Sequence, residues 1–155
     1  VGTTKRIDVA AAGDRLIGVF KGVAYVDANG DTQYRPYWAS GQTTKGSVDA
    51  EATVWDDPLI LFRGQVSSAT GLVAADVGAF ADLVIAAGST LTGNSGDQID
   101  QTTITSTVAT GGQVRIEELS REVGNAFGQY AKAIVRLNEH YLLGSTTAGQ
   151  AAMAI

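Results

Sequence analysis

Cysteine is absent from this chain of 155 residues, and His140 is its single histidine. The absence of cysteine excludes disulfide bonds, thiolate metal sites, iron–sulfur clusters and a cysteine nucleophile. With one histidine, a single chain also cannot build the usual histidine-rich metal sites. These absences remove several classes of metal and redox chemistry, and we expect a function that needs no cofactor.

Long hydrophobic runs and an excess of positive charge are also lacking. The longest apolar stretches, such as Leu83 to Ala87, are much shorter than the run of about 20 residues that spans a bilayer. Lys and Arg number 11 against 16 Asp and Glu, which gives a net charge of −5 and a pI near 4.7. Because binding to nucleic acid phosphates needs a basic surface, we expect neither a nucleic acid nor a membrane as partner.

The composition favours short strands joined by turns. The chain has 19 glycines, one methionine and 45% hydrophobic residues. A protein of 16.0 kDa hides roughly two-thirds of its unfolded surface on folding, which suffices for one core. We therefore predict a single all-β domain over residues 15–143, mainly an antiparallel barrel or sandwich with at most one or two short helices. Residues 1–14 and 144–155 are expected to form extended terminal arms.

The clearest local pattern is a β-hairpin. Asn29-Gly30 lies between two strand-like runs, Leu16 to Val26 and Thr32 to Trp38, and both residues of the pair tolerate a positive φ. Two glycines in the first run predict a bend or bulge. Pro36 in the second run predicts an edge strand or a break in the ladder.

Further strands are expected along the rest of the chain. They cover residues 50–55, 59–66, 113–119 and 131–141, while residues 73–88 fit either a helix or a strand, with the strand favoured slightly. In the last run, Ala131, Ala133, Val135 and Leu137 alternate with Lys132, Arg136, Asn138 and His140. This alternation predicts a half-buried strand, with the second set pointing away from the core.

Several patterns resemble catalytic or binding motifs but lack an essential part. The loop from Gly88 to Ser95 has the spacing of a phosphate-binding loop, yet Asn94 stands where a lysine is required. Asp27, Asn29 and Asp31 alternate as in a calcium loop, but no glycine follows at the sixth position and no glutamate at the twelfth. We interpret both segments as turns or surface loops.

The remaining candidates for catalysis are interpreted in the same way. Asp56 and Asp57 precede Pro58, where carboxylates cap backbone amides, so turn chemistry explains them better than a pair of catalytic acids. His140 has no nucleophile-elbow motif to accompany it, and we expect it to be exposed or hydrogen-bonded. The chain is therefore not expected to be an enzyme.

Three aromatic residues, Tyr34, Tyr37 and Trp38, are the strongest candidates for a contact surface. On a strand, Tyr34 and Trp38 would share one face and Tyr37 would face away. Aromatic side chains on a sheet can fill a core, anchor a protein interface, or stack on sugars or bases. Core filling and a protein interface both remain open for them.

Several short segments occur in an order that a known family shares. They are Ile17-Gly-Val-Phe20-x-Gly22, Tyr25-Val-Asp27-x-x-Gly30, Tyr37-Trp38, Asp56-Asp57-Pro58 with Phe62 and Gln65, Gly88-Ser89-x-x-Thr92-Gly93, Gly124-Asn125-x-x-Gly128-x-Tyr130-Ala131 and Leu137-Asn138-Glu139-His140. In this order, the chain from Leu16 to Tyr141 resembles the small cement, or decoration, proteins that coat the capsids of tailed bacteriophages.

The resemblance implies a virion structural protein. Such a protein is made in the cytoplasm of the bacterial host and lies on the outer surface of the capsid, where it bridges neighbouring subunits of the major capsid protein. Its partners would be the major capsid protein and other copies of itself, as a trimer or dimer. The contact residues would be Thr3, Lys5 and Arg6 in the N-terminal arm, and Tyr34, Tyr37 and Trp38 as anchors.

Two hypotheses from other classes stay open. A β-rich carbohydrate-binding or adhesion module would need Tyr34, Trp38 or Trp55 exposed on a flat platform. A hydrolase would need a cleft that brings His140 to a carboxylate.

Overall fold

The computed structural model describes residues 7–46, 48–67, 70–107 and 111–142. Its elements are β1 (Val19–Val26), β2 (Thr32–Arg35), β3 (Glu51–Trp55), β4 (Leu61–Gln65), η1 (Ala74–Asp76), β5 (Phe80–Ala81), β6 (Leu83–Val84), β7 (Gln98–Ile99), η2 (Gln101–Thr103), β8 (Val114–Leu119) and β9 (Lys132–Leu137). The strands pair antiparallel, and the two helices are single 3₁₀ turns. The predicted all-β class is confirmed.

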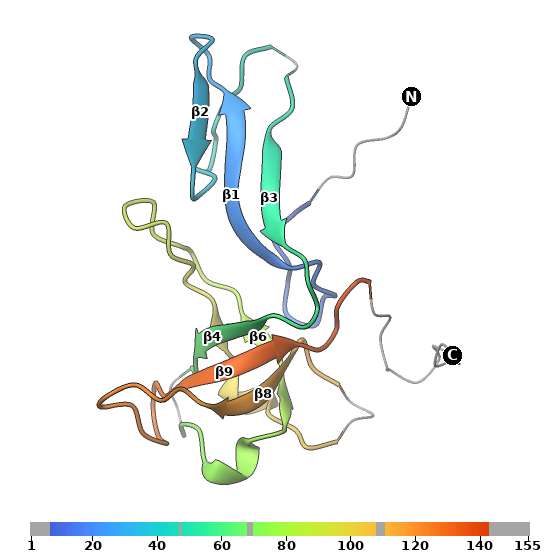
Figure 1. Ribbon diagram of the computed structural model, residues 1–155, viewed down its shortest axis with the longest axis vertical. Helices are drawn as coiled ribbons and strands as arrows, with labels where there is room; N and C mark the ends of the chain where they lie inside the picture. The colour runs from blue at the N-terminus through green and yellow to red at the C-terminus, as the bar shows by residue number, and fades with distance from the viewer. Residues whose placement is uncertain (1–6, 47, 68–69, 108–110, 143–155) are drawn as a thin grey trace.

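The strands form three separate sheets, which Figure 1 shows as two regions. One sheet, in the order β2-β1-β3, extends away from the rest of the molecule, and we call it the projecting sheet. The second, in the order β4-β9-β8-β5, is the body sheet, and the short β6-β7 ribbon lies beside it. The body sheet ends at β4 and β5, so the described strands do not close into a barrel.

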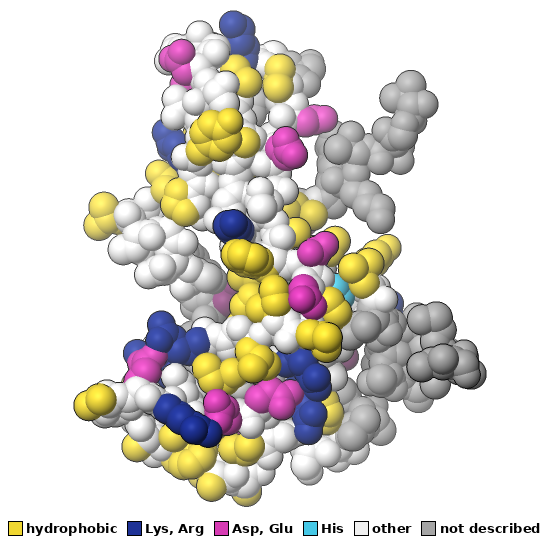
Figure 2. Space-filling model, in the orientation of Figure 1, with side chains coloured by type: hydrophobic (Ala, Val, Ile, Leu, Met, Phe, Trp, Pro, Cys, Tyr) yellow, Lys and Arg dark blue, Asp and Glu magenta, His cyan; other side chains and the backbone are white. Residues whose placement is uncertain are grey.

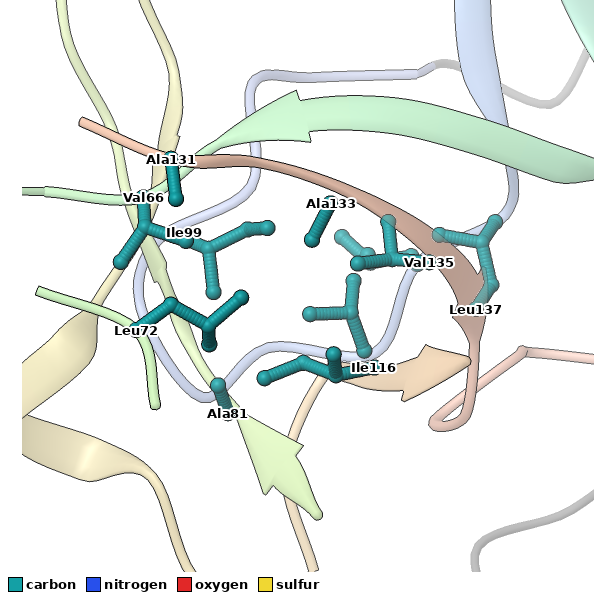
Figure 3. Close-up of a cluster of buried hydrophobic side chains, with 11 residues drawn as sticks. Val66, Leu72, Ala81, Ile99, Ile116, Ala131, Ala133, Val135 and Leu137 are labelled. Carbon is teal, nitrogen blue, oxygen red and sulfur yellow. The ribbon is translucent and has the colours of Figure 1, made fainter. Parts of the chain in front are cut away.

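The hydrophobic core lies in the body (Figure 3). It consists of Leu16, Val66, Leu72, Ala81, Ile99, Val114, Ile116, Ala131, Ala133, Val135 and Leu137. The alternation predicted for the last strand is confirmed here, since Ala133, Val135 and Leu137 of β9 point inward. Leu16 is the one member that comes from the chain before β4, so the main core contains no residue of the projecting sheet.

The projecting sheet has a small buried centre of its own. Val23 and Tyr25 of β1 are 5% and 3% exposed, and the ring of Trp38 meets the ring of Tyr25 edge-on at 5.3 Å between centroids. The loop after β2, which carries Trp38, thus covers one face of this sheet. The bulge predicted for the first strand is also present, because the pairing of β1 with β3 shifts register between Phe20 and Gly22.

The predicted hairpin joins β1 to β2, and Asp27 holds its turn. One carboxylate oxygen of Asp27 accepts the amides of Asn29, Gly30 and Asp31 at 2.9 to 3.0 Å. The hydrogen bond from the Asp31 amide, with those from Gln33, Asn29 and Gly30, keeps the pKa of Asp27 below its usual range. Gly30 alone of the predicted pair has a positive φ, +99°. The five residues between Val26 and Thr32 form a longer turn than the two-residue type, because the capping carboxylate of Asp27 organises it.

The strand after this turn is shorter than predicted. β2 ends at Arg35 rather than at Trp38, because Pro36 cannot continue the hydrogen-bond ladder. β2 does form an edge of the projecting sheet, as predicted. The ambiguous segment 73–88 contains η1 followed by β5 and β6, so the preference for strand over a long helix is confirmed.

Gln113, which is completely buried, connects distant parts of the body. Its Nε2 donates to the carbonyl oxygens of Ala11 and Asp14, both at 2.9 Å, and its Oε1 accepts the Leu83 amide at 2.9 Å. Its backbone carbonyl accepts the amide of Asn138 at 2.8 Å. Residues 11–14, expected to belong to an extended terminal arm, are instead tied to the body by these hydrogen bonds.

His140 is also completely buried. The prediction that it points to the polar side of its strand is wrong, because β9 ends at Leu137 and His140 instead pairs with Leu16 in a parallel bridge. The expected hydrogen bond is present, since its Nδ1 accepts the Leu142 amide at 3.1 Å. Among the described residues its Nε2 has no hydrogen-bond partner.

We predict that Gln113→Ala destabilises the fold by about 2 to 3 kcal/mol, because it removes the three hydrogen bonds that this completely buried side chain makes. Urea unfolding measures the loss, and amide exchange should rise at residues 11–16. Gln113→Glu keeps the acceptor for Leu83 but cannot donate to Ala11 and Asp14, so amide exchange at residues 11–16 should rise in this variant as well. Exchange unchanged in both variants would contradict the role of Gln113.

Candidate functional site

The face of the projecting sheet turned away from Tyr25 carries exposed aromatic residues, and we call it the outer face. Strand register defines it: Ala24 of β1 pairs with Tyr34 of β2, and Val19 of β1 pairs with Trp55 of β3. Residues paired across strands share a face, and the bulge preserves this arrangement. Tyr34 and Trp55 therefore project from the same surface.

These aromatic side chains are unusually accessible. Tyr34 is 78% exposed and Trp55 is 47% exposed. The Nζ of Lys21 lies 4.5 Å from the centre of the Trp55 ring, a cation–π contact that holds the indole in place. Figure 2 shows hydrophobic side chains and a cation over the projecting sheet. The outer face thus presents large, ordered aromatic groups to solvent.

A shallow groove crosses this face. Its lining includes Lys21, Gly22, Ala24, Tyr34 and Thr53. Gly22 and Ala24 contribute small groups to the lining, and Lys21 and Thr53 contribute polar ones. The groove therefore places the exposed ring of Tyr34 beside small and polar groups.

Trp38 belongs to the opposite face, which corrects the expected pairing with Tyr34. Trp38 packs on Tyr25, whereas Tyr34 pairs with Ala24, and adjacent residues of a strand face opposite ways. The even spacing of Tyr34 and Trp38 does not place them on one face, because β2 ends before Pro36 and Trp38 is no longer part of the strand. The side chain of Trp38 nevertheless remains 44% exposed.

Tyr37 is half-buried and has a structural role. Its hydroxyl accepts a hydrogen bond from Arg35 Nη1 at 3.5 Å, and the Arg35 guanidinium makes cation–π contacts with the rings of Tyr25 and Tyr37, at 5.9 and 5.8 Å from their centres. Of the three predicted aromatic contact residues, Tyr34 is thus the fully available one. Thr3, Lys5 and Arg6 lie outside the described residues.

The outer side of the body sheet carries a network of charged side chains. Glu122, in the loop after β8, forms ion pairs with Arg63 of β4 and with Lys132 of β9, the latter at 2.8 Å. Glu117 is paired with Arg115 and Arg136 at 3.8 and 3.4 Å. The hydrogen bond from Lys132, together with the charges of Arg63 and Lys132, holds the pKa of Glu122 below its usual range.

The other sequence candidates lie in turns or in the interior. Asp57 accepts the Leu59 amide at 2.9 Å, which confirms the turn expected before β4. The loop from Gly88 to Ser95 uses the amides of Ser89 and Gly93 in its own hydrogen bonds. His140 is enclosed in the body. Among the described residues, no group of three His, Cys, Asp or Glu side chains is placed to hold a metal ion.

Sequence reasoning gave Trp55 a role only in the carbohydrate hypothesis and left out Val19 and Lys21. Their place on the outer face depends on the register between β1 and β3, which are 24 residues apart at their nearest ends. The long connection between β1 and β3 gives no indication in the sequence of which residues of the two strands pair. The alternation of Glu51, Thr53 and Trp55 on the exposed side of β3 is the signal that could have indicated it.

The two aromatic residues should differ in their effect on stability. Trp38→Ala removes a ring that packs on Tyr25 and is predicted to lower the free energy of unfolding by about 1 to 2 kcal/mol. Tyr34→Ala should change it by less than about 0.5 kcal/mol, since most of the side chain is in solvent. Urea denaturation of both variants measures the difference, and equal losses would contradict the assignment of faces.

A titration tests the charged network. Because the pKa of Glu122 is lowered in the folded state, its pairs contribute stability above the usual value of 4.5, and this contribution is lost as the pH falls through the folded pKa. Lys132→Gln should move the pKa of Glu122 upward in carbon-13 NMR titrations. Lys45→Gln, a change in the projecting sheet's loop, is the matched control and should leave it unchanged.

Searches for related proteins do not extend this description. No family, no curated protein and no solved structure matches the chain. Within the described residues, no helix is long and apolar enough to cross a membrane. The outer face of the projecting sheet is therefore the feature from which a function can be argued.

Proposed function

We propose that this chain is a cement protein of a tailed-bacteriophage capsid. It lies on the outer surface of the shell, binds the major capsid protein through the outer face of its projecting sheet, and bridges neighbouring capsid subunits as a homo-oligomer. The order of segments from Leu16 to Tyr141 supports the family, and the exposed Tyr34 and Trp55 support the contact surface. The action is structural rather than catalytic.

The main observation behind the proposal is that the outer face of the projecting sheet carries exposed aromatic side chains, while the sheet itself has only a small buried centre. A small sheet needs packing on at least one face for stability, and the loop with Trp38 covers only the inner face of this one. Tyr and Trp are the residues that dominate protein interfaces when they are desolvated. Burying Tyr34 and Trp55 against a partner would complete the packing of the sheet.

Stabilisation of the shell follows by mass action. A ligand that binds the assembled state alone stabilises it by about 2.7 kcal/mol per site when it is present at a hundredfold excess over its Kd. Because each shell offers many equivalent sites, modest affinity at each site is sufficient. A rigid scaffold with a few exposed anchors meets this requirement.

The groove on the outer face favours a second candidate, a carbohydrate-binding or adhesion module. Tyr34 lines this groove together with Gly22 and Ala24, and Lys21 and Thr53 are its polar neighbours. Rings beside polar groups can stack on sugars and hydrogen-bond their hydroxyls. A glycan pull-down with wild type and Tyr34→Ala distinguishes this candidate from the cement role.

Re-addition to stripped capsids tests the cement role. Shells from which the protein has been removed are mixed with wild type, Tyr34→Ala or Trp55→Ala, and occupancy and the temperature of DNA release are measured. Each variant should bind on the order of tenfold more weakly, and coated shells should release DNA at a higher temperature than stripped ones. The control is Tyr141→Ala, which removes a body tyrosine of similar exposure, 57%.

Two outcomes would contradict the proposal. Stripped and coated shells that release DNA at the same temperature would exclude stabilisation by this protein. Equal binding by wild type and both variants would exclude the outer face as the contact.

A further inference from the structure

The turn between β1 and β2 contains two adjacent residues that can react with each other. Asn29 is followed directly by Gly30, and both are exposed. Among the described residues, no hydrogen bond holds the Asn29 carboxamide. The carboxamide carbon of an asparagine can close a five-membered ring with the next backbone nitrogen, and a glycine there leaves the nitrogen unshielded because it has no Cβ. The pair is therefore a candidate for spontaneous covalent modification.

The other three asparagines of the chain do not meet these conditions. Asn94, Asn125 and Asn138 precede serine, alanine and glutamate rather than glycine. The carboxamide of Asn125 is also held by hydrogen bonds with the backbone of Lys132, and that of Asn138 donates to the Gly112 carbonyl at 2.9 Å. Reactivity of this kind is thus expected at the hairpin first.

The turn itself requires a glycine at position 30. Gly30 has a φ of +99°, and a Cβ atom there would lie 2.7 Å from the Nζ of Lys45. Any other residue would therefore be strained by its backbone conformation and crowded by its neighbour. Because the hairpin cannot avoid this reactive pair, any restraint on it must come from the surrounding groups.

Asp27 supplies such a restraint on the Gly30 nitrogen. The Gly30 N–H donates to both the carbonyl oxygen and a carboxylate oxygen of Asp27, each at 3.0 Å. Ring closure breaks both hydrogen bonds, and a hydrogen bond to a charged acceptor is stronger than one to a neutral acceptor. The hydrogen bond from the Asp31 amide, with those from Gln33, Asn29 and Gly30, keeps the pKa of Asp27 low. The carboxylate is therefore a good acceptor but a poor base for removing the amide proton.

We propose that Asn29 is a site of spontaneous deamidation and that the Asp27 carboxylate slows this reaction in the folded protein. The Gly30 nitrogen loses its proton and attacks Cγ of Asn29, and Nδ2 leaves as ammonia with that proton. The new C–N bond closes a cyclic imide. Water then adds to one of the two imide carbonyls and breaks its C–N bond, which gives aspartate or isoaspartate. This inference does not depend on the proposed function.

Isoaspartate at position 29 would disturb the hairpin. The main chain would then run through the former side chain, which lengthens the backbone by a methylene group and places a new carboxylate beside Asp27. The turn amides that now converge on one oxygen of Asp27 could no longer do so. Because Val26 and Thr32 form the ladder pair next to this turn, β2 should lose pairing from this end.

Timed peptide mapping of the full chain tests the proposal. Wild type, Asp27→Ala and Asp31→Ala are incubated at mildly alkaline pH, and mass spectrometry follows the conversion of the Asn29 amide to a carboxylate. Asp27→Ala should react on the order of tenfold faster than wild type, because it loses a hydrogen bond to a charged group. Asp31→Ala is the matched control and should react like wild type, since the Asp31 carboxylate accepts none of the described turn amides.

Two further measurements separate this restraint from a general loss of folding. Asp27→Asn keeps a side-chain oxygen as acceptor for the Gly30 amide, so its rate should lie between those of wild type and Asp27→Ala. In urea that unfolds all variants, the rates should become equal and exceed the rate of folded wild type, because the turn no longer exists. An isoaspartyl methyltransferase assay should show isoaspartate accumulating in the same order.

Amide exchange tests the effect on the hairpin. Deamidated wild type, separated by ion exchange through its added negative charge, should exchange faster than the unmodified protein at Thr32–Arg35 of β2. Exchange at Lys132–Leu137 of β9, in the body, should be unchanged. Equal exchange of β2 in the two forms would show that the predicted disturbance is absent.

The proposal is wrong if Asp27→Ala and wild type deamidate at the same rate, or if Asp31→Ala is accelerated as much as Asp27→Ala. It is also wrong if unfolding in urea does not raise the wild-type rate, or if Asn94 reacts before Asn29. Because these experiments contain no capsid, their failure leaves the cement role untouched, and failure of the cement role leaves this inference in place.

Discussion

The hydrogen bonds of Gln113 are the constraint on which the arrangement depends. One buried residue joins the segment before β1, the β5-β6 connection and the end of β9. Because the Gln113 side chain is buried, water does not compete for these hydrogen bonds. Breaking any one of them would leave a polar group without a partner. Leu16, which follows the tethered segment, then enters the core beside His140. The chain therefore leaves the body at a fixed place and in a fixed direction.

The projecting sheet begins just after this tethered segment of the chain. Gly18 passes so close to β3 that a Cβ atom there would lie 2.1 Å from the carbonyl oxygen of Trp55, so a glycine is required. Beyond it, the sheet contributes nothing to the main core and is supported by Tyr25, Arg35 and Trp38. The molecule thus combines a well-packed body with a sheet whose outer face leaves Tyr34 and Trp55 exposed. That division of the core explains why aromatic residues stay in solvent.

Local patterns in the sequence predicted much of the fold. The hairpin at Gly30, the bulge before Gly22 and the inward side of β9 follow from short-range rules. The errors arose where distant segments decide the result. His140 turns inward because Leu16, far away in the chain, pairs with it, and Trp38 changes face because Pro36 ends β2. The outer face was half predicted: Tyr34 was named as a contact, whereas Val19 required the register of β3.

If the protein is a cement protein as proposed, the outer face of its projecting sheet is buried when it binds a capsid. Hydroxyl-radical footprinting of the free and capsid-bound protein tests this most directly, because it reports the exposure of single side chains. Tyr34 and Trp55, exposed in the free chain, should become protected on the shell, while Leu91 should react as before. Equal labelling of Tyr34 and Trp55 in the free and bound protein would contradict the account.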